Sequence, residues 1–177
     1  MTSSVNEETR PQQGWAHRQG KIAMHPIRPM RWDAEALSAR AQIAEAFYRF
    51  GMAFDEIQLD ALCSCFVEDG VLESSLARAE PRSSVRGHEE IRRHLRAAMD
   101  VQQDQRRHLM SNVVVEDLVL ERGTAKALAQ CIVAATGTEL QLACAVIYTA
   151  ELRRDPDDCW RFSYFFIGMD KYVPSAR

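Results

Sequence analysis

The stretch RRHLMSNVVVE, residues 106–116, opens the half of the chain that decides the fold. Alternate side chains of an extended chain share a face, so we predict that His108, Met110, Asn112 and Val114 point the same way. A similar alternation, interrupted by short turn signals, continues toward the C-terminus. The sequence therefore predicts strands joined as an antiparallel meander, over residues 105–120, 124–135, 139–153 and 159–169.

Helical spacing governs the chain before that stretch. Ile43, Phe47, Phe50 and Phe54 recur at i, i+4, i+7 and i+11, which is the apolar stripe of an amphipathic helix. A second helix over residues 59–66 is predicted to end before the turn signal DG at residues 69–70. The pattern then indicates a short strand, a polar insert and a third helix, over residues 71–75, 77–84 and 87–99.

Helices that precede strands in this order are typical of an α+β fold rather than an α/β fold. Residues 1–30 are rich in Ser, Gln, Arg and Pro and have no sustained hydrophobic period. We predict that residues 1–30 form a disordered N-terminal tail and that residues 31–173 form one domain. The sequence leaves Met1, Met24 and Met30 as alternative starts of the chain.

Composition argues against several classes of function. The chain has 177 residues, of which 46% are hydrophobic and 27% charged, as in a globular domain with a real core. Its formal charge of -3 and pI near 6.0 offer no general attraction for nucleic acid or anionic membranes. No apolar segment approaches the ~20 residues that span a bilayer, and no signal peptide is evident. We therefore expect a cytoplasmic protein that binds neither nucleic acid nor a membrane.

The sequence also predicts no metal site and no cofactor. The five cysteines are an odd number that lie mostly within apolar patterns, as reduced core cysteines do. Cys63 and Cys65 lie on different helix faces with no histidine nearby. His88 and His94 are about 240° apart around their helix and do not share a face. Glycine-rich phosphate loops are absent from the sequence.

Four blocks of the sequence occur in the order found in a known family. They are IAEAFYRFGMAFDEIQLDALCSCFVEDGVLE, RGHEEIRRHL, RRHLMSNVVVE and IYTAELRRDPDDCWRF. Together, over residues 33–170, they resemble the SnoaL-like branch of the nuclear transport factor two-like superfamily. The resemblance implies a cone-shaped, curved antiparallel sheet packed on three N-terminal helices and enclosing an apolar cavity. This superfamily contains both enzymes and non-catalytic subunits, so the fold alone does not choose a function.

The resemblance also implies a catalytic pair. In dehydratase-like members an Asp at the end of the first helix faces a His at the start of the long strand, and Asp55 and His108 occupy those positions. A carboxylate bonded to one imidazole nitrogen fixes the tautomer and leaves the other nitrogen to transfer a proton. Taken alone, each residue is more often a solvated or structural group than a catalytic one. Phe54 replaces the Tyr of those members and residues 132–134 lack their second His, so scytalone dehydration itself is not implied.

Five side chains are predicted to contact a ligand in the cavity. Phe54, Met110 and Tyr148 supply apolar or amphipathic contact surface. Tyr48, two turns before the acid, either offers its hydroxyl or is an aromatic at the edge of the core. Asn112 either donates a hydrogen bond to a developing oxyanion or satisfies backbone groups near the strand.

Two functions fit these residues. One is a cofactor-independent lyase (dehydratase) or isomerase that acts on a small cyclic, mostly apolar carbonyl or hydroxy compound by general acid-base catalysis. The other is a non-catalytic ligand-binding or assembly protein of the same fold. In the last strand both sets of alternate residues are apolar, so both faces of the strand are apolar. One set is Trp160, Phe162, Tyr164 and Phe166, and the other is Phe165, Ile167 and Met169. We therefore expect a homodimer, or a higher assembly, through the convex face of the sheet.

Overall fold

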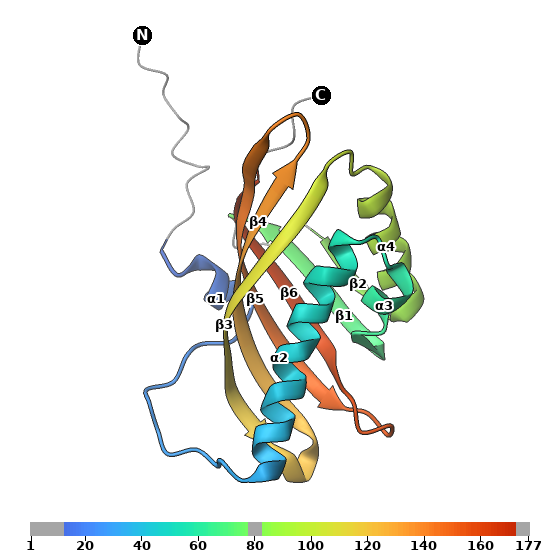
Figure 1. Cartoon of the computed structure of the whole chain (residues 1–177). Helices are drawn as coiled ribbons and strands as arrows, with labels where there is room; N and C mark the ends of the chain where they lie inside the picture. Colours follow the sequence, from blue (N-terminus) through green and yellow to red (C-terminus); the bar gives the residue numbers. More distant parts are fainter. Residues whose placement is uncertain (1–12, 78–82, 173–177) are drawn as a thin grey trace.

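A computed structural model describes residues 13–77 and 83–172 of the chain. Figure 1 shows one long helix, α2, lying across a strongly curved sheet, with α3 and α4 beside it. The elements, in chain order, are α1 (Trp15–Gln19), α2 (Ala34–Asp55), α3 (Leu59–Cys63), β1 (Phe66–Leu76), β2 (Ser83–Arg86), α4 (His88–Asp100), β3 (Gln105–Val119), the short turn η2 (Leu120–Arg122), β4 (Thr124–Thr136), β5 (Leu140–Arg154) and β6 (Trp160–Tyr172).

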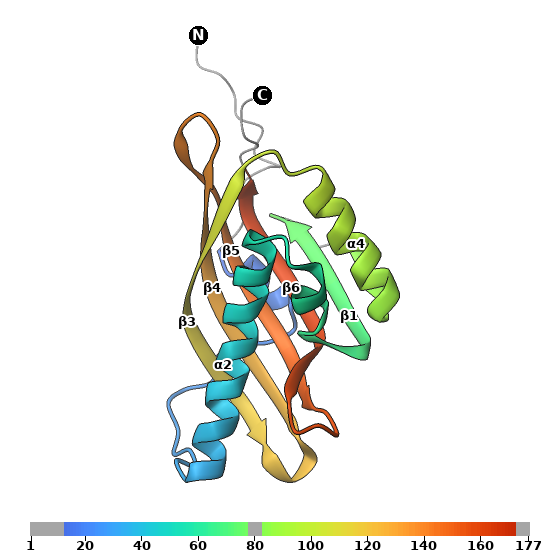
Figure 2. The same ribbon diagram turned by 45° about the vertical axis from the view of Figure 1, so that its right-hand side comes forward.

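The strands of the described residues form one unclosed sheet in the order β2-β1-β6-β5-β4-β3. Strands β3 to β6 pair antiparallel with their sequence neighbours, which confirms the predicted meander. Strand β1 pairs in parallel with β6, so the sheet is mixed at this end and not antiparallel throughout as predicted. Helices α2, α3 and α4 lie on one side of the curved sheet (Figures 1 and 2). The α+β cone fold is confirmed.

Helix α2 is fixed by a cap and by its apolar stripe. The Asp33 carboxylate accepts a hydrogen bond from the Ala36 N–H at 3.0 Å, which satisfies one of the free donors at the helix start. The predicted stripe turns Phe47 and Phe50 fully into the core, where the Phe50 ring lies 4.7 Å from that of Phe165. Burial of an aromatic side chain stabilises the fold by about 1.5–3 kcal/mol. The stripe therefore determines which face of α2 meets the sheet.

The second helix is shorter than predicted. It ends at Cys63 and strand β1 already begins at Phe66, so Asp69 and Gly70 lie within a strand. Pairing between β1 and β6 shifts register between Phe66 and Val71, which marks a bulge-like irregularity. Turn residues occur both at bulges and at helix ends, so the pattern pointed to the wrong element. Part of the predicted polar insert forms β2, and residues 78–82 lie outside the described part of the chain.

Part of the predicted N-terminal tail is ordered. Trp15 belongs to helix α1, and its indole packs edge-on against Phe166 with the ring centroids 6.4 Å apart. The indole N–H also donates a hydrogen bond to Asp170 at 2.7 Å. The prediction of disorder therefore does not hold for Trp15–Gln19, while residues 1–12 lie outside the described residues. One docked tryptophan leaves no hydrophobic period, so composition could not reveal it.

A bulge in β6 changes which of its aromatic side chains share a face. Phe162 pairs with Leu152 and Tyr164 with the preceding Glu151, so Ser163 is an extra residue. As a result Phe162 and Phe165 face the helices together, with their rings stacked 4.3 Å apart. The predicted grouping by strict alternation, which put these two rings on opposite faces, is wrong for this reason.

Candidate active site

A mostly apolar cavity of about 230 Å³ lies between the helices and the sheet. An apolar cavity of about 150 Å³ is large enough for benzene, so this one admits a ligand of one or two small rings. Its wall is built from α2, α4, β1, β3, β4, β5 and β6. The lining side chains are Phe50, Phe54, Leu72, Ser74, His94, Leu95, Ala98, Arg106, His108, Val133, Cys144, Val146, Tyr148, Ile167 and Met169.

Asp55 and His108 meet at this cavity. The Nδ1 atom of His108 lies 2.6 Å from Oδ1 of Asp55, and the backbone N–H of His108 donates to Oδ2 at 2.7 Å. The two side chains are 8% and 4% exposed for His108 and Asp55 respectively. A carboxylate group that accepts at both oxygens favours the tautomer with the proton on Nδ1, and in the neutral imidazole of this tautomer Nε2 keeps its lone pair. One acid thus orients both the ring and the backbone of the histidine.

The position of Asp55 is unusual for a carboxylate. It is the last residue of α2, where the helix dipole disfavours negative charge by about 0.3–1 kcal/mol. The two N–H groups of His108 offset this cost. A buried acid at the wrong end of a helix is a signal of function that sequence reasoning could have used.

Gly51 permits the close approach of α2 to β3. A Cβ atom added at Gly51 would lie 2.9 Å from the Cβ atom of His108, which is closer than side chains pack. Glycine inside a helix costs roughly 0.5–1 kcal/mol relative to alanine, so its presence here needs a reason of this kind. The Phe54 ring then closes over the histidine, with the two ring centroids 5.5 Å apart. Sequence reasoning missed Gly51, although a glycine in the middle of an apolar stripe was visible.

Tyr148 is the buried hydroxyl group of the cavity wall. Its ring stacks on that of Phe165, with the centroids 5.1 Å apart. Burial raises the pKa of Tyr148 well above its ordinary value, so the phenol keeps its proton. Burial likewise raises the pKa of Cys131 to about 12 and that of Cys144 to about 11. These thiols are therefore not nucleophiles near neutral pH.

Three of the predicted ligand contacts lie elsewhere. Tyr48 is exposed on the outer face of α2, so it does not share a face with the buried Asp55. Asn112 has a positive φ of 50° at a register shift of β3, is exposed and donates to the Gln130 side chain at 2.6 Å. The bulge interrupts the alternation that was expected to align Asn112 with the histidine. Met110 packs near Gly51 and is not among the residues that line the cavity.

Two charged or ionisable side chains of the cavity were missed. Arg106 lies two residues before His108 on β3 and therefore on the same face of the strand. Its Nε lies 3.0 Å from the Asp104 carboxylate. Alternation along the strand could have found it. His94 reaches the cavity from α4, one residue before the buried Leu95. Its role depends on how α4 packs, which the sequence pattern does not give.

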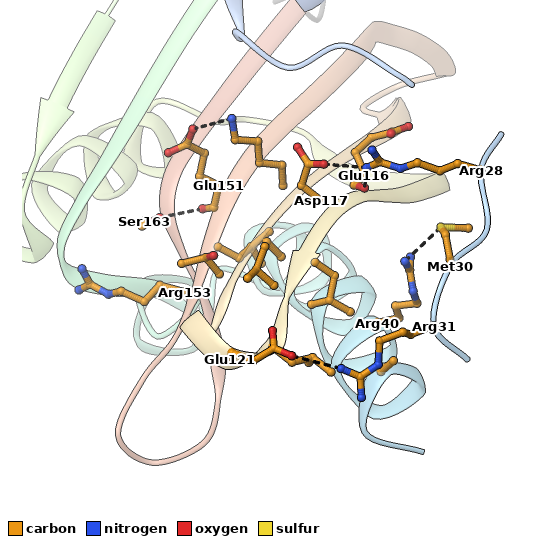
Figure 3. A pocket seen from close by; sticks show the side chains of 18 of the residues that line it. Arg28, Met30, Arg31, Arg40, Glu116, Asp117, Glu121, Glu151, Arg153 and Ser163 are labelled. Atoms are coloured by element: carbon orange, nitrogen blue, oxygen red, sulfur yellow. Dashed lines mark hydrogen bonds and ion pairs between the residues drawn. The ribbon is translucent and has the colours of Figure 1, made fainter. Parts of the chain in front are cut away.

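A larger hollow of about 670 Å³ lies away from the histidine, between the 28–31 segment and the ends of β3, β4 and β5. Figure 3 shows that several of its charged side chains pair with one another: Arg31 contacts Glu121, and Arg28 contacts Asp117. These paired charges leave little for a ligand to bind. We therefore assign the candidate site to the smaller apolar cavity, whose wall includes His108, the partner of Asp55.

Two further features bear on the class of protein. In residues 13–77 and 83–172 no group of three or more His, Cys, Asp and Glu side chains is placed to hold a metal ion. Over the same residues no helix is long and apolar enough to cross a membrane.

Solved structures share this fold. A protein of unknown function with a cystatin-like fold from Nostoc punctiforme is 21% identical, with a TM-score of 0.68 over 82% of this chain and 98% of that one. The beta subunit of a proposed aromatic-ring-hydroxylating dioxygenase from Novosphingobium aromaticivorans is 16% identical, with a TM-score of 0.68 over 79% and 94%. ActVI-ORFA from Streptomyces coelicolor is 16% identical, with a TM-score of 0.61 over 73% and 96%. Such low identities show the fold alone.

Sequence comparison gives the family. No curated protein matches the chain. The SnoaL-like domain, as a family model, matches residues 35–165, from the start of α2 into β6. Because this match covers most of the chain and the fold agrees with it, the protein belongs to the SnoaL-like domain family of the nuclear transport factor two-like superfamily.

Proposed function

We propose that the protein is a cofactor-independent lyase (dehydratase) or isomerase that acts on a small cyclic, mostly apolar carbonyl or hydroxy compound. The observation that carries this proposal is the 2.6 Å contact between Asp55 and His108 at the wall of the apolar cavity. A histidine oriented by a buried carboxylate is a suitable general base near neutral pH. The apolar lining matches a ring that has few polar groups.

The chemistry assigned to the pair is proton transfer next to a carbonyl group. The Nε2 atom of His108 takes the proton from the carbon α to the carbonyl, and the electrons of the broken C–H bond pass into the enolate. Return of a proton to another carbon gives an isomer, whereas departure of a β-hydroxyl group as water gives a dehydrated product. Asp55 stabilises the imidazolium that forms in the first step, as the acid of a catalytic triad does. The protonated Tyr148 adds a hydrogen-bond donor to the wall.

The test is deuterium exchange of 2-tetralone, a fused-ring ketone of suitable size. We expect the wild type in D₂O to accelerate exchange of its α-protons, as followed by proton NMR. His108→Gln removes the base with little change in volume and should lower the exchange rate by about 10²- to 10⁴-fold. His88→Gln is the matched control, because His88 begins α4 outside the cavity. Equal exchange by wild type and His108→Gln would overturn the proposal.

A second candidate function is ligand binding without catalysis. It is favoured by the apolar lining of the cavity, most of which comes from residues other than His108. If 2-tetralone shifts the NMR signals of cavity residues but is not exchanged by the wild type, the protein is a binding or assembly protein and not a lyase or isomerase.

We also propose that a second copy of the chain covers the convex face of the sheet. The structure changes the residues involved, because Trp15 of α1 already covers Phe166. Apolar side chains still exposed on this face include Leu109 and Ile132, which pair across β3 and β4 and are 59% and 41% exposed. Leu142, which follows on β5, is 58% exposed. Such a patch fits a symmetric self-contact.

The predicted assembly is tested by light scattering at micromolar concentration. The wild type should be a dimer or a higher assembly, and Ile132→Glu should reduce it to monomers because a carboxylate would be buried without a partner. Leu37→Glu is the control, since Leu37 is similarly exposed, at 48%, but lies on α2. A monomeric wild type would exclude this interface.

A further inference from the structure

His94 is a second ionisable group in the wall of the cavity. It lies on α4, whose buried side chains Ile91, Leu95 and Met99 anchor the helix. His94 and Ala98 are four residues apart, so they lie on one strip of the helix, and both line the cavity. The packing of α4 therefore directs an imidazole at the space that also contacts His108.

His94 has no protein partner to explain its position. Among residues 13–77 and 83–172 its ring has no hydrogen-bond or ion-pair partner, whereas the His108 ring is bonded to Asp55. The neighbouring charges on α4 are engaged elsewhere, since Arg92 pairs with Asp60 and Arg93 with Glu90. Its ring is half-buried at the wall of the cavity, so its nitrogens are free to bond a ligand there.

The two imidazoles belong to different walls of the cavity. Figures 1 and 2 show α4 on the β1 side of the sheet and β3 at the opposite edge, with α2 between them. His94 comes from α4 and His108 from β3, and both line the cavity. This arrangement allows a proton to leave the ligand at one atom while another arrives at a second atom.

We propose that His94 is a further catalytic residue of this site, acting as the general acid opposite the general base His108. This proposal rests on the proposed function. When His108 Nε2 removes a proton from carbon, negative charge develops on the ligand oxygen. In the isomerisation His94, as the acid, gives its proton to that oxygen, so the carbonyl becomes an enol. In the dehydration it gives the proton to the departing hydroxyl group instead, which leaves as water. The cycle closes when the proton gained by His108 and the one lost by His94 exchange with solvent.

The experiment uses a series of benzisoxazoles whose product phenols differ in acidity, from 5-nitrobenzisoxazole to the unsubstituted compound. In this elimination the base takes the proton on C3, the N–O bond breaks, a nitrile forms and the electron pair goes to the phenolate oxygen. A general acid matters most when that phenolate is a poor leaving group. The slope of log kcat against the pKa of the leaving phenol therefore reports whether an acid assists.

We expect the wild type to show a shallow slope and His94→Gln a steeper one. The variant should lose little rate with the nitro compound and about 10²-fold or more with the unsubstituted compound, within the range for general acids. The KM should stay near the wild-type value. His88→Gln, on the first turn of the same helix, should leave both the rates and the slope unchanged.

The outcomes separate this proposal from the proposed function. Parallel slopes for wild type and His94→Gln would overturn the role of His94, even if His108→Gln abolishes turnover. A wild type no faster than His108→Gln with every compound would instead overturn the proposed function, and the role of His94 with it. Thermal melts of each variant verify that the fold is retained. Partial unfolding would lower the rate with every compound equally and would leave the slope unchanged.

Discussion

Replacement of Asp55 by Asn is expected to lower the α-proton exchange rate of 2-tetralone by about 10²- to 10⁴-fold, with the fold retained. The two carboxylate oxygens of Asp55 accept from two N–H groups of His108, one on the ring and one on the backbone. An amide has one acceptor oxygen in place of the two oxygens of the carboxylate, and its NH2 group can only donate, so in the geometry of Asp55 it can satisfy only one of these N–H groups.

The backbone N–H cannot change, so the amide oxygen is expected to bind it and the amide N–H to face the ring. The ring Nδ1 atom must then accept, which moves the imidazole proton to Nε2 and removes the lone pair that acts as the base. Triads lose about 10⁴-fold in rate through the same change of tautomer. The consequence is a loss of kcat that exceeds any loss of ligand binding.

Nitrogen-15 NMR of the imidazole ring distinguishes the two tautomers of His108 directly. The control is Asp69→Asn, which alters an exposed contact with Arg153 and should change neither the ring nor the rate. If Asp55→Asn keeps the wild-type tautomer and the wild-type rate, the carboxylate does not orient the base, and the catalytic pair must be abandoned.

Substitution of Gly51 by Ala is expected to reduce the same exchange rate by about 10²-fold, the size of effect produced by a misplacement of about 1 Å. The added methyl group would lie 2.9 Å from the Cβ atom of His108, so either α2 or β3 has to move. Asp55 lies one turn further along α2, and this shift therefore changes its contact with the ring. Overpacking of this kind also costs roughly 1–3 kcal/mol, partly offset by the better helix propensity of alanine.

Gly137→Ala is the matched control, because a Cβ atom at Gly137 would meet nothing within 4 Å. Exchange rates and thermal melts of the two variants are compared under the same conditions. Wild-type activity and wild-type stability in Gly51→Ala would show that the approach of α2 to β3 is not tight and that the position of His108 does not depend on it.

Local periodicity predicted much of this fold because it reports on the immediate environment of each element. The apolar stripe of α2 and the alternation that begins near residue 105 gave the long helix and the meander with boundaries close to those observed. The parallel contact of β1 with β6 left no such trace. Its two strands are about ninety residues apart in the sequence, and nothing in either strand alone specifies the direction of the other.

In the candidate site, too, some features followed from the sequence and others from the tertiary structure alone. The sequence itself determined the α+β order of elements, and the family resemblance singled out Asp55 and His108, which the structure brings into contact. Only the tertiary structure decided that Asn112 turns away at a bulge and that Tyr48 faces outward. A bulge shifts the side-chain alternation by one residue, and the facing of a helix end depends on how it packs, so short-range patterns cannot determine either.

The same physical reason applies to Gly51 and His94. The importance of each residue comes from an element remote in sequence. Gly51 is needed because β3 approaches α2 closely there, and His94 reaches the cavity because α4 packs against β1. The sequence determines which faces of a helix or strand are apolar. The curvature of the sheet and the packing of the helices on it determine which polar side chains share the enclosed space, and therefore which of them can act on one ligand.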